Sequence, residues 1–564
     1  MPAQPDRQRF WDWIVLLVTL LTLASGLLNI YSVIGPSLAD RLQSLRHYFP
    51  LEFISFSRSV VLVIGFGLVV LSWNIHRRKR TAWWLAMGAT LFSTVFHLTK
   101  GIDYEEASIS ALLALALILS RQRFTVRSWT EGFRDALLRL GLAATVAFSY
   151  GTVGFWLLEP REFRYDFGWK EAAQAALSYL SFGAGAGNAL VPHTHYATWF
   201  LDSLWITSTV GLLYAGYVLF RPAYYAFRLH PLELEEARRI VERHGRSTQD
   251  FFKAWPDKSF YFSPTRESFL AYRVAADCAV VLGDPVGPSS ELRSLIADFL
   301  AYCHENDWRL TFHQATPDLL CVYESLGFRR FKVGDDAVVE LEKFQLEGRT
   351  GKALRSNITK VERCGLALEV YEAPLSDALL RDLKQVSDSW LGLAGRRERQ
   401  FTLGYFNVDY LRSTTVLAVR NASGELQAFL NIIPSHVPGE ATVDLMRRRA
   451  DSMNGVMDYL FTKVLLHCKS SGYSRFSLGM APMAGFQPGE ASSAEERAIH
   501  AFFQKSNVGF SFQGIRDYKS KFATSWEPRY ILFRHHLDLA RLAIALRKVS
   551  EMPEPRWTPM ENAS

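Results

Sequence analysis

The chain has few cysteines and none of the paired cysteine motifs. Only five of its 564 residues are cysteine, all between Cys278 and Cys468, and none forms a C-x-x-C pair. Widely spaced single thiols are typical of a reducing compartment and argue against a disulfide framework or a zinc site. We therefore expect no bound metal, and the sequence offers no motif that requires a cofactor.

Two further absences narrow the function. The carboxyl-terminal part has no Arg/Gln-x-x-Gly-x-Gly/Ala loop, whose N–H groups cradle the pyrophosphate of coenzyme A in acetyltransferases. A reaction that depends on coenzyme A is therefore disfavoured. The net charge of +7 lies almost entirely in the first 228 residues, so the remainder is close to neutral. Any anion site in the remainder must be a local cluster of basic residues.

The amino-terminal part is instead rich in long apolar runs, several of them near the ~20 residues that cross a bilayer. The runs are Trp13–Ile34, Ser59–Trp73, Trp83–Leu98, Ala107–Leu119, Leu137–Leu158 and Trp199–Phe220. Tryptophans stand at many of their ends, as is typical of interfacial aromatics. We expect an α-helical integral membrane domain of about six spans over residues 1–230.

Loop charge predicts the orientation of these spans. Arg77–Arg80 and Arg121–Arg134 are the strongest basic loops and lie two spans apart, which places both on the cytosolic side. Both chain ends then lie in the cytosol, together with the carboxyl-terminal domain. Ala172–Val191, which is moderately apolar and rich in glycine, is interpreted as an interfacial or re-entrant helix, because six spans already satisfy the charge pattern.

The carboxyl-terminal part is interpreted as two related α/β units in tandem. In residues 231–345 the pattern predicts three strands, a helix (Leu292–Asn306), a strand, a short helix and a last strand. Tyr323-x-x-x-Gly327-Phe328 resembles the late part of the acyl-CoA N-acyltransferase fold. In residues 346–548 the same kind of unit starts again, with a helix, a strand, a helix, three strands, a helix and a last strand, and 549–564 are expected to form a flexible tail. The predicted fold class is therefore a cytosolic α/β domain of two tandem acyl-CoA N-acyltransferase-like units.

Three clusters could carry chemistry. In the first, Asp444 stands at the end of a predicted strand beside Arg447 and Arg448, and Asp458 follows. A carboxylate beside guanidinium groups can accept a proton from a hydroxyl while the arginines hold an anion. A solvated turn with ion pairs is the competing interpretation.

The second cluster alternates cations with aromatic residues, which suits a phosphate in a partly apolar site. Its charged members are Arg516, Asp517, Lys519, Lys521, Glu527 and Arg529. On a predicted strand Lys519 and Lys521 share one face, while Tyr518 and Phe522 point the other way, into the core. A strand with outward charges is the alternative.

The third cluster is the basic segment Arg349–Arg363. On a helix, Lys352, Arg355 and Arg363 fall near one face, as needed to follow a phosphate backbone, and Lys360 adds to the charge. A hydrated helix face is the alternative.

Taken together, the sequence resembles the lysylphosphatidylglycerol synthetase family, also called multiple peptide resistance factor. The segments that carry the resemblance are Arg355–Asn357, Glu398 with Phe401–Phe406, Asp444–Arg448 with Gly455–Phe461, Ser477–Phe486 and Phe512–Tyr530. The chain departs from the family in two ways. It has room only for the helices next to the synthase and not for the amino-terminal flippase helices of long members, and Tyr405 stands where a basic residue is expected.

The resemblance implies transfer of an amino acid, lysine or alanine, from aminoacyl-tRNA to the glycerol hydroxyl of phosphatidylglycerol in the bacterial cytoplasmic membrane. The product lipid would give resistance to cationic antimicrobial peptides. Aminoacyl-tRNA is an activated ester, so the transfer needs neither ATP nor a metal, only positioning, proton transfer and oxyanion stabilisation. Asp444 would orient or deprotonate the hydroxyl, while Arg447 and Lys519 would hold the lipid phosphate or the tRNA end. Supporting or substrate-binding roles fall to Glu398, Arg448, Asp458, Arg516, Lys521, Glu527, Arg529, Arg355 and Lys360.

Two other classes stay open from the residues alone. One is a membrane-tethered acyl- or aminoacyltransferase that acts on another envelope precursor, and the other is a non-enzymatic lipid carrier. The sequence also leaves open whether the chain forms a homo-oligomer.

Overall fold

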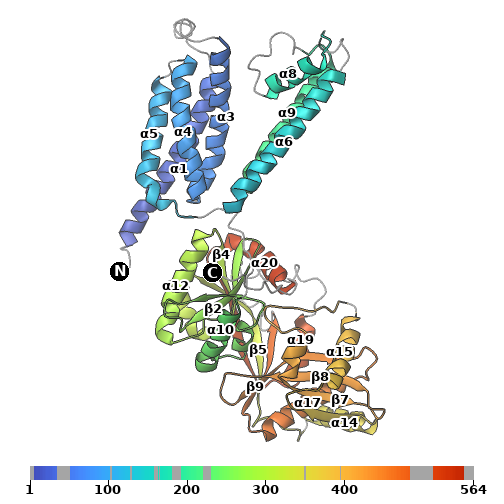
Figure 1. The fold of residues 1–564 in the computed structure, drawn as a ribbon. Helices are drawn as coiled ribbons and strands as arrows, with labels where there is room; N and C mark the ends of the chain where they lie inside the picture. Colours follow the sequence, from blue (N-terminus) through green and yellow to red (C-terminus); the bar gives the residue numbers. More distant parts are fainter. Residues whose placement is uncertain are drawn as a thin grey trace. The chain divides into compact units, whose positions relative to one another are not determined.

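The structure is a computed structural model with two compact units. It describes residues 5–34, 51–101, 104–126, 130–157, 163, 165–180, 192–219, 230–348, 351–393, 395–482 and 512–551. The helical unit comprises residues 1–224 with 304–307, and the sheet unit comprises residues 225–303 with 308–564. Figure 1 shows the helices of the first unit and the mixed sheet of the second.

Each of the six predicted apolar runs overlaps a helix of the helical unit. These helices are α1 (Pro5–Ile34), α3 (Leu51–His76), α4 (Arg80–Gly101), α5 (Tyr104–Ser120), α6 (Thr130–Leu157) and α9 (His195–Leu219), with α8 (Trp169–Leu180) in addition. α1 packs against α3 and α5, and α4 packs between α3 and α5, whereas α6 packs against α8 and α9. A Cβ on Gly26 of α1 would lie 2.8 Å from the carbonyl oxygen of Gly65 on α3, so glycine permits this close helix crossing.

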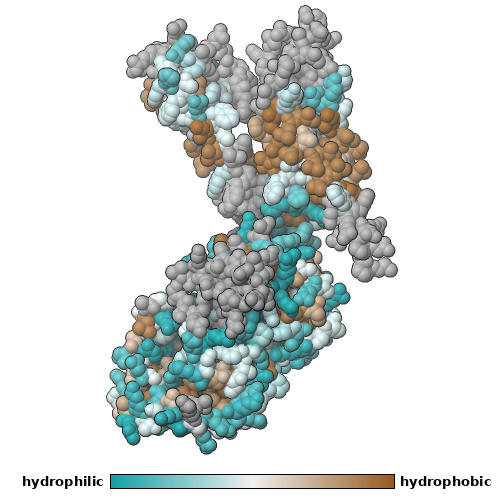
Figure 2. Space-filling view, turned by 180° about the vertical axis from the view of Figure 1, so that it is seen from behind, coloured by the Kyte–Doolittle hydropathy of each residue, from teal (hydrophilic) through white to brown (hydrophobic). Residues whose placement is uncertain are grey.

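Within the described ranges, two helical segments are long and apolar enough to cross a membrane, Trp13–Ser32 and Leu140–Leu157, and Val63–His76 is a shorter apolar helix. Figure 2 shows a broad hydrophobic surface on the helical unit. The number of six spans therefore stays a prediction. α8 covers the first part of the segment expected to be interfacial, and residues 181–191 of that segment lie outside the described residues.

The sheet unit contains one continuous sheet of eleven strands, in the order β1-β2-β3-β4-β11-β5-β10-β9-β8-β7-β6. The first half of the unit contributes β1 (Ser259–Phe262), β2 (Phe269–Ala275), β3 (Cys278–Leu282), β4 (Arg309–Ala315) and β5 (Arg329–Glu340). The second half contributes β6 (Ala367–Tyr371), β7 (Thr415–Arg420), β8 (Leu426–Ile433), β9 (Glu440–Arg448), β10 (Arg475–Pro482) and β11 (Ser525–Phe533).

The two halves repeat a strand–helix–strand crossover. The parallel strands β3 and β4 are joined by α12 (Ser289–Glu305), and the parallel strands β9 and β10 are joined by α17 (Val456–Ser470). The other helices of the unit are α10 (Pro231–His244), α11 (Asp250–Lys253), α13 (Leu320–Ser325), α14 (Lys352–Arg363), α15 (Asp377–Leu391), α16 (Val408–Arg412), α19 (Phe512–Ser520) and α20 (Leu539–Glu551). The α/β order predicted from the sequence is therefore present in both halves.

The halves exchange their last strands. β5 of the first half pairs with β10 of the second, and β11 of the second half lies between β4 and β5 of the first. All three of these pairings are antiparallel. Because each half completes the sheet of the other, the two repeats form one folded body and not two separable domains.

Two apolar cores lie on opposite faces of the sheet. Val416 and Ala418 of β7 belong to the core under α15, whereas Leu417 and Val419 belong to the core under α14 and α17. This division follows from the alternation of side chains along a strand.

Two local predictions are wrong. Residues 512–520 form the helix α19 and not a strand, so Lys519 lies in the last helical turn. Tyr518 and Phe522 still meet the core residue Phe461, at ring-centroid distances of 5.9 and 5.7 Å, because positions four apart also share a side at the end of a helix. Asp444 lies in the middle of β9, which continues to Arg448, and not at the strand end.

Candidate functional site

The candidate site lies where the parallel ladder between β9 and β10 ends. The two strands pair only over Glu440–Thr442 and Arg475–Ser477, although they continue to Arg448 and Pro482. The register of β10 against β5 shifts between Ser477 and Met480, and Gly479 there has a φ of +75°. We call residues 443–448 of β9 and 478–482 of β10 the ladder end.

Asp444 is the buried carboxylate of the ladder end. The backbone N–H of Gly404 donates to its Oδ1 at 3.0 Å, and the hydroxyl of Tyr410 donates to its Oδ2 at 2.7 Å. A Cβ on Gly404 would lie 2.1 Å from Oδ2, so this approach requires glycine. Burial raises the pKa of Asp444 to about 6, although the two hydrogen bonds act in the opposite direction. The carboxyl group can therefore change protonation state close to neutral pH.

Tyr410 is held as a donor to Asp444. The side-chain amide of Asn431 donates to its hydroxyl oxygen at 2.9 Å, and the amide oxygen of Asn431 accepts from the backbone of Leu445 at 2.9 Å. The ring of Trp255 meets the Tyr410 ring edge-on with centroids 4.6 Å apart. Burial raises the pKa of Tyr410 well above its usual value, so its hydroxyl keeps its proton.

Arg447 is buried and donates to three acceptor atoms of the protein. Its guanidinium donates to both carboxylate oxygens of Glu398, at 2.8 and 2.7 Å, and also to the hydroxyl of Ser387. It lies 5.1 Å from the ring centre of Trp390. This planar pairing through two hydrogen bonds fixes the orientation of the Glu398 carboxylate. In this structure Arg447 therefore holds Glu398 in place. Arg448 binds the carbonyl of Arg449 and the hydroxyl of Ser452 in the turn that follows.

Lys519 approaches the ladder end from α19. Its ammonium donates to the carbonyl oxygens of Gly479 at 2.9 Å and Met480 at 3.0 Å. Burial lowers the pKa of Lys519 to about 8, while the negative charge of Asp336 opposes that shift. An ammonium group has three N–H donors, so one donor can still meet a phosphate oxygen.

The rest of the second cluster surrounds α19 and β11. Lys521 forms an ion pair with Asp458 at 2.9 Å and lies 4.9 Å from the ring centre of Tyr518. Arg516 lies 5.0 Å from the ring centre of Trp526 and 3.7 Å from a carboxylate oxygen of Asp335. These two cations therefore have local partners on or near α19.

Glu527 and Arg529 belong to an ion-pair network across β11, β5 and β10. Arg529 donates to Oδ2 of Asp336 from Nε and Nη2, at 2.7 and 2.6 Å, and Glu527 accepts from Arg475 at 2.5 Å. Oδ1 of Asp336 is buried and meets no hydrogen-bond donor among the described residues. The sequence reasoning missed Asp335, Asp336 and Arg475. The adjacent carboxylates in the middle of β5, next to the apolar run Ala337–Val339, are the signal that could have found Asp335 and Asp336.

Arg355 and Lys360 lie on α14, away from these buried groups. Both are exposed, as are Lys352 and Arg363, whereas Leu354 and Val361 of the same helix are buried in the core. Each exposed residue is thus free to meet solvent or a large anion, apart from a 3.1 Å hydrogen bond from Arg355 to the carbonyl of Gly348. Arg349 lies outside the described residues.

The predicted site residues therefore fall into three groups. Asp444, Arg447 and Glu398 meet on the β9 side of the ladder end, with Arg448 in the turn that follows β9. Lys519 reaches β10 from α19, and Asp458, Arg516, Lys521, Glu527 and Arg529 surround α19 and β11. Arg355 and Lys360 form a separate basic surface on α14. Within the described part of the chain, no group of three or more His, Cys, Asp and Glu side chains could hold a metal ion.

Comparisons with known proteins point to one family. The sequence model described as phosphatidylglycerol lysyltransferase, C-terminal, matches residues 238–533. A phosphatidylglycerol lysyltransferase of Bacillus subtilis is 27% identical over 529 residues, which cover 93% of this chain and 58% of that protein. One from Staphylococcus haemolyticus is 31% identical over 336 residues, which cover 59% of this chain and 40% of that protein. The chain thus matches about half the length of these relatives.

Two solved structures resemble the sheet unit. The structure of L-PGS from Bacillus licheniformis has a TM-score of 0.52 and 29% identity, and the match covers 58% of this chain and 99% of that one. The C-terminal domain of a putative lysylphosphatidylglycerol synthetase from Agrobacterium fabrum has a TM-score of 0.51 and 32% identity, with 57% and 97% coverage.

Proposed function

The chain belongs to the phosphatidylglycerol lysyltransferase C-terminal family, and on that basis we propose that it transfers an amino acid from aminoacyl-tRNA to a glycerol hydroxyl of phosphatidylglycerol. The observation that carries the proposal is the buried Asp444, held by Gly404 and Tyr410 with a pKa of about 6 inside the family-matched region. A carboxylate in this state suits general-base catalysis near neutral pH.

The reaction needs one bond formed, one broken and one proton moved. The lipid hydroxyl oxygen attacks the ester carbonyl carbon of aminoacyl-tRNA, and the bond to the terminal ribose oxygen of the tRNA breaks. Asp444 takes the proton from the lipid hydroxyl, and the proton then goes to the ribose oxygen as it leaves. Two of the acceptor positions on the Asp444 carboxylate are occupied by Gly404 and Tyr410, which leaves others for the hydroxyl.

Lys519 supplies the positive charge at the ladder end. With a pKa of about 8, its ammonium is protonated at neutral pH, and a phosphate group would stabilise that form further. We assign it to the phosphate of phosphatidylglycerol or to the terminal phosphate of the tRNA. Arg516, Lys521 and Arg529 add to the positive field around α19 and β11.

The exposed basic side of α14 is the proposed contact for the tRNA backbone. Lys352, Arg355, Lys360 and Arg363 all face solvent there. Exposed cations that do not pair with carboxylates bind a phosphate backbone without sequence preference. These residues therefore act in substrate affinity and not in the chemical step.

For the helical unit we propose six membrane spans with both chain ends in the cytosol, in the cytoplasmic membrane of a bacterium. Two candidate spans and the basic loops at Arg77–Arg80 and Arg121–Arg134 support this placement. Reporter fusions after Arg80 and after Arg228 are both expected to give a cytosolic signal. A periplasmic signal from the second fusion would contradict it, because the sheet unit could not then meet tRNA.

The transfer itself is tested by reconstitution. The full chain is placed in phosphatidylglycerol vesicles with tRNA charged with labelled lysine or with labelled alanine, and the lipid fraction is analysed. We expect label in a new lipid with one of the two donors, and its absence with the Asp444→Asn variant. Such a lipid carries an added positive charge, which lowers the attraction of the membrane for cationic peptides. No labelled lipid with either donor would contradict the proposal.

A further inference from the structure

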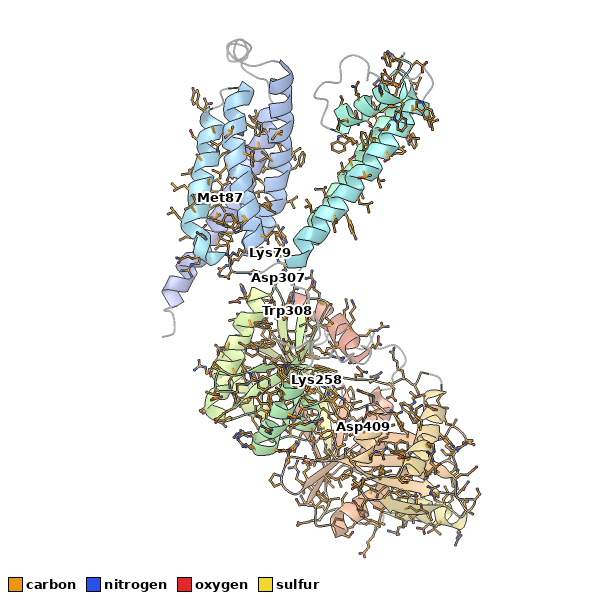
Figure 3. All side chains as sticks on the ribbon, in the orientation of Figure 1. Lys79, Met87, Lys258, Asp307, Trp308 and Asp409 are labelled. Atoms are coloured by element: carbon orange, nitrogen blue, oxygen red, sulfur yellow. The ribbon has the colours of Figure 1, made fainter. Side chains whose placement is uncertain are left out.

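Two buried charges of the first half, Asp257 and Lys258, lie in the turn between α11 and β1. Their exposed fractions are 0% and 1%, and the Lys258 ammonium forms an ion pair with Oδ1 of Asp257. Figure 3 labels Lys258 among the side chains of the sheet unit. Two charges are costly to bury unless further contacts use their remaining atoms. The other contacts of this pair therefore indicate what it holds in place.

Those contacts lead to Phe401 in the second half. The backbone N–H of Phe401 donates to Oδ2 of Asp257 at 2.8 Å, and the Lys258 ammonium lies 5.4 Å from the centre of the Phe401 ring. Phe401 is fully buried and has a φ of +75°. A bulky residue adopts this left-handed conformation only when its surroundings impose it. Asp257 supplies one of the bonds that impose it.

Phe401 belongs to the loop of residues 398–406, which also contacts the candidate site. At its start, Glu398 pairs with Arg447 on β9, and near its end the N–H of Gly404 donates to Asp444. The N–H of Phe406 then closes the loop on Glu398 at 3.4 Å. The loop thus joins Asp257 in the first half to two predicted site residues on β9.

The same loop is fixed from two further sides. The N–H of Gln400 donates to the carbonyl of Ser550 on α20 at 3.0 Å. The ring of Trp255, two residues before Asp257, lies edge-on to that of Tyr405 with centroids 6.0 Å apart. The loop is thus contacted by β9, by α20 and by the turn before β1. Loss of the Asp257 contact should therefore shift the loop without unfolding it.

We propose that Asp257 and Lys258 are positioning residues for the transfer reaction. The pair fixes Phe401 in its left-handed conformation, and Phe401 in turn keeps the Gly404 N–H on the Asp444 carboxylate. Neither residue touches the reacting atoms, and the kinetic part of this inference rests on the proposed function. The half of the sheet unit that lacks the predicted site residues would in this way set the geometry of the half that carries them.

Loss of the hydrogen bond from Gly404 to Asp444 changes the pH dependence of the transfer reaction. Asp444 is faced by the Gly404 N–H, the Tyr410 hydroxyl, the Arg447 guanidinium and the Glu398 carboxylate. A hydrogen bond to an ionised carboxylate favours the charged form and lowers its pKa. If the Gly404 N–H moves away, the pKa of Asp444 rises, and the acid limb of the kcat/KM profile moves to higher pH.

The test compares two double variants, of which only one keeps an acceptor for the backbone N–H of Phe401. Asp257→Asn with Lys258→Met removes both charges but leaves an amide oxygen for the Phe401 N–H, whereas Asp257→Ala with Lys258→Met removes that acceptor as well. Neutral replacement of a buried ion pair is often tolerated, so the Asn variant should keep kcat within about threefold of wild type. The Ala variant should lose kcat on the order of 10- to 100-fold, as misplaced catalytic groups do. Its KM for aminoacyl-tRNA should not change, and its acid limb should move upward.

Amide hydrogen exchange gives a readout that does not depend on the reaction. The Phe401 and Gly404 amides should exchange faster in the Ala variant but not in the Asn variant. Tyr323→Phe, which removes a buried hydrogen bond elsewhere in the first half, is the control and should change neither exchange in this loop nor the pH profile. Equal exchange in the two double variants would overturn the inference. A wild-type chain that forms no aminoacyl lipid would instead overturn the proposed function, and the exchange comparison would still decide about the loop.

Discussion

Each half of the sheet unit contains one parallel strand pair, and the two pairs differ in how many residues are hydrogen-bonded. In the first half, β3 and β4 pair over five residues, Cys278–Leu282 with Arg309–His313, and the N–H of Gly283 continues the pairing to His313 at 2.7 Å. In the second half, the equivalent β9 and β10 pair over only three residues. The ladder therefore stays closed in the first half and ends early in the second, where the candidate site residues gather.

The polar residues beside the two pairs differ in the same sense. Asp284, which follows β3, accepts from the Tyr323 hydroxyl and from both the backbone N–H and the hydroxyl of Thr316, each at 2.8 Å. Lys253 donates to its carboxylate neighbour Asp250 as well as to the carbonyl of Asp284. In the second half, by contrast, Asp444 accepts one hydrogen bond from a backbone N–H and one from a side-chain hydroxyl, and within the described ranges Lys519 donates to two carbonyl oxygens. Asp284 of the first half therefore accepts more hydrogen bonds from the protein than Asp444 of the second half does. We infer that Asp444 and Lys519 can form further hydrogen bonds with a substrate.

Replacement of Asp444 and of Asp284 by asparagine should give the largest difference between a role in transfer and a role in stability. Asp444→Asn is expected to lower transfer on the order of 10²-fold or more, because it removes the general base. Asp284→Asn should weaken the fold, because it replaces a charged acceptor of three hydrogen bonds, yet retain transfer per folded molecule. Transfer rates and thermal unfolding of both variants provide the check. Comparable losses of transfer in the two would break the comparison.

Lys519 of the second half and Lys253 of the first provide the next contrast. Lys519→Met should reduce transfer on the order of 10²-fold through loss of phosphate stabilisation, with little change in stability, because its partners are carbonyl groups. Lys253→Met leaves the Asp250 carboxylate buried without its cation and should cost about 3–5 kcal/mol of stability. Vesicle transfer assays and denaturant unfolding measure the two effects. Full activity of Lys519→Met would remove Lys519 from the site.

The pH profile sharpens the comparison further. Asp444 must be ionised and Lys519 protonated, so kcat/KM should be bell-shaped between the pKa values of about 6 and about 8. Because burial raises the pKa of Asp444 from 3.8 to about 6, the stability of the wild type falls as the pH rises from about 4 to about 6 and is level above that. Asp444→Asn should therefore gain stability relative to wild type over that pH range, by on the order of 1–3 kcal/mol, and the gain should stay constant at higher pH. A gain that does not depend on pH would contradict this interpretation.

The smallest expected effects lie on α14. Arg355→Ala and Lys360→Ala should each weaken tRNA binding by a few-fold at low salt, and the difference should shrink as the salt concentration rises, because fewer counterions are released. Their kcat at saturating tRNA should stay near that of wild type. Fluorescence binding of tRNA over a salt series measures the effect. A loss of kcat without loss of affinity would place α14 in the chemical step instead.

The sequence predicted the order of strands and helices because hydrophobic alternation and turn residues report local structure directly. The strand predicted at residues 512–520 was wrong, because the same charged and aromatic residues are also compatible with a helix. In that helix and the turn after it, the aromatic side chains contact Phe461. The exchange of β5 and β11 was not predictable either, since no local pattern states which strand lies beside which.

Among the candidate site residues, Asp444, Arg447 and Glu398 were predicted from their motifs, and the structure shows that Arg447 pairs with Glu398. Asn431 and Tyr410 escaped notice, because single polar residues in apolar segments resemble ordinary core positions. Asp257 and Lys258 escaped for another reason. Their importance depends on a contact with Phe401, 144 positions along the chain from Asp257, which only the fold creates.

The central claim is that this chain makes an aminoacyl lipid at the ladder end of its second half. The most direct measurement expresses the wild-type chain, Asp444→Asn and Asp284→Asn in bacterial cells that lack aminolipids, and identifies the lipids by mass spectrometry. We predict a new phosphatidylglycerol derivative that is heavier by one amino-acid residue in cells with the wild type and with Asp284→Asn, and its loss with Asp444→Asn. The absence of that lipid in cells with folded wild-type protein, or its presence at wild-type level with Asp444→Asn, would contradict the account.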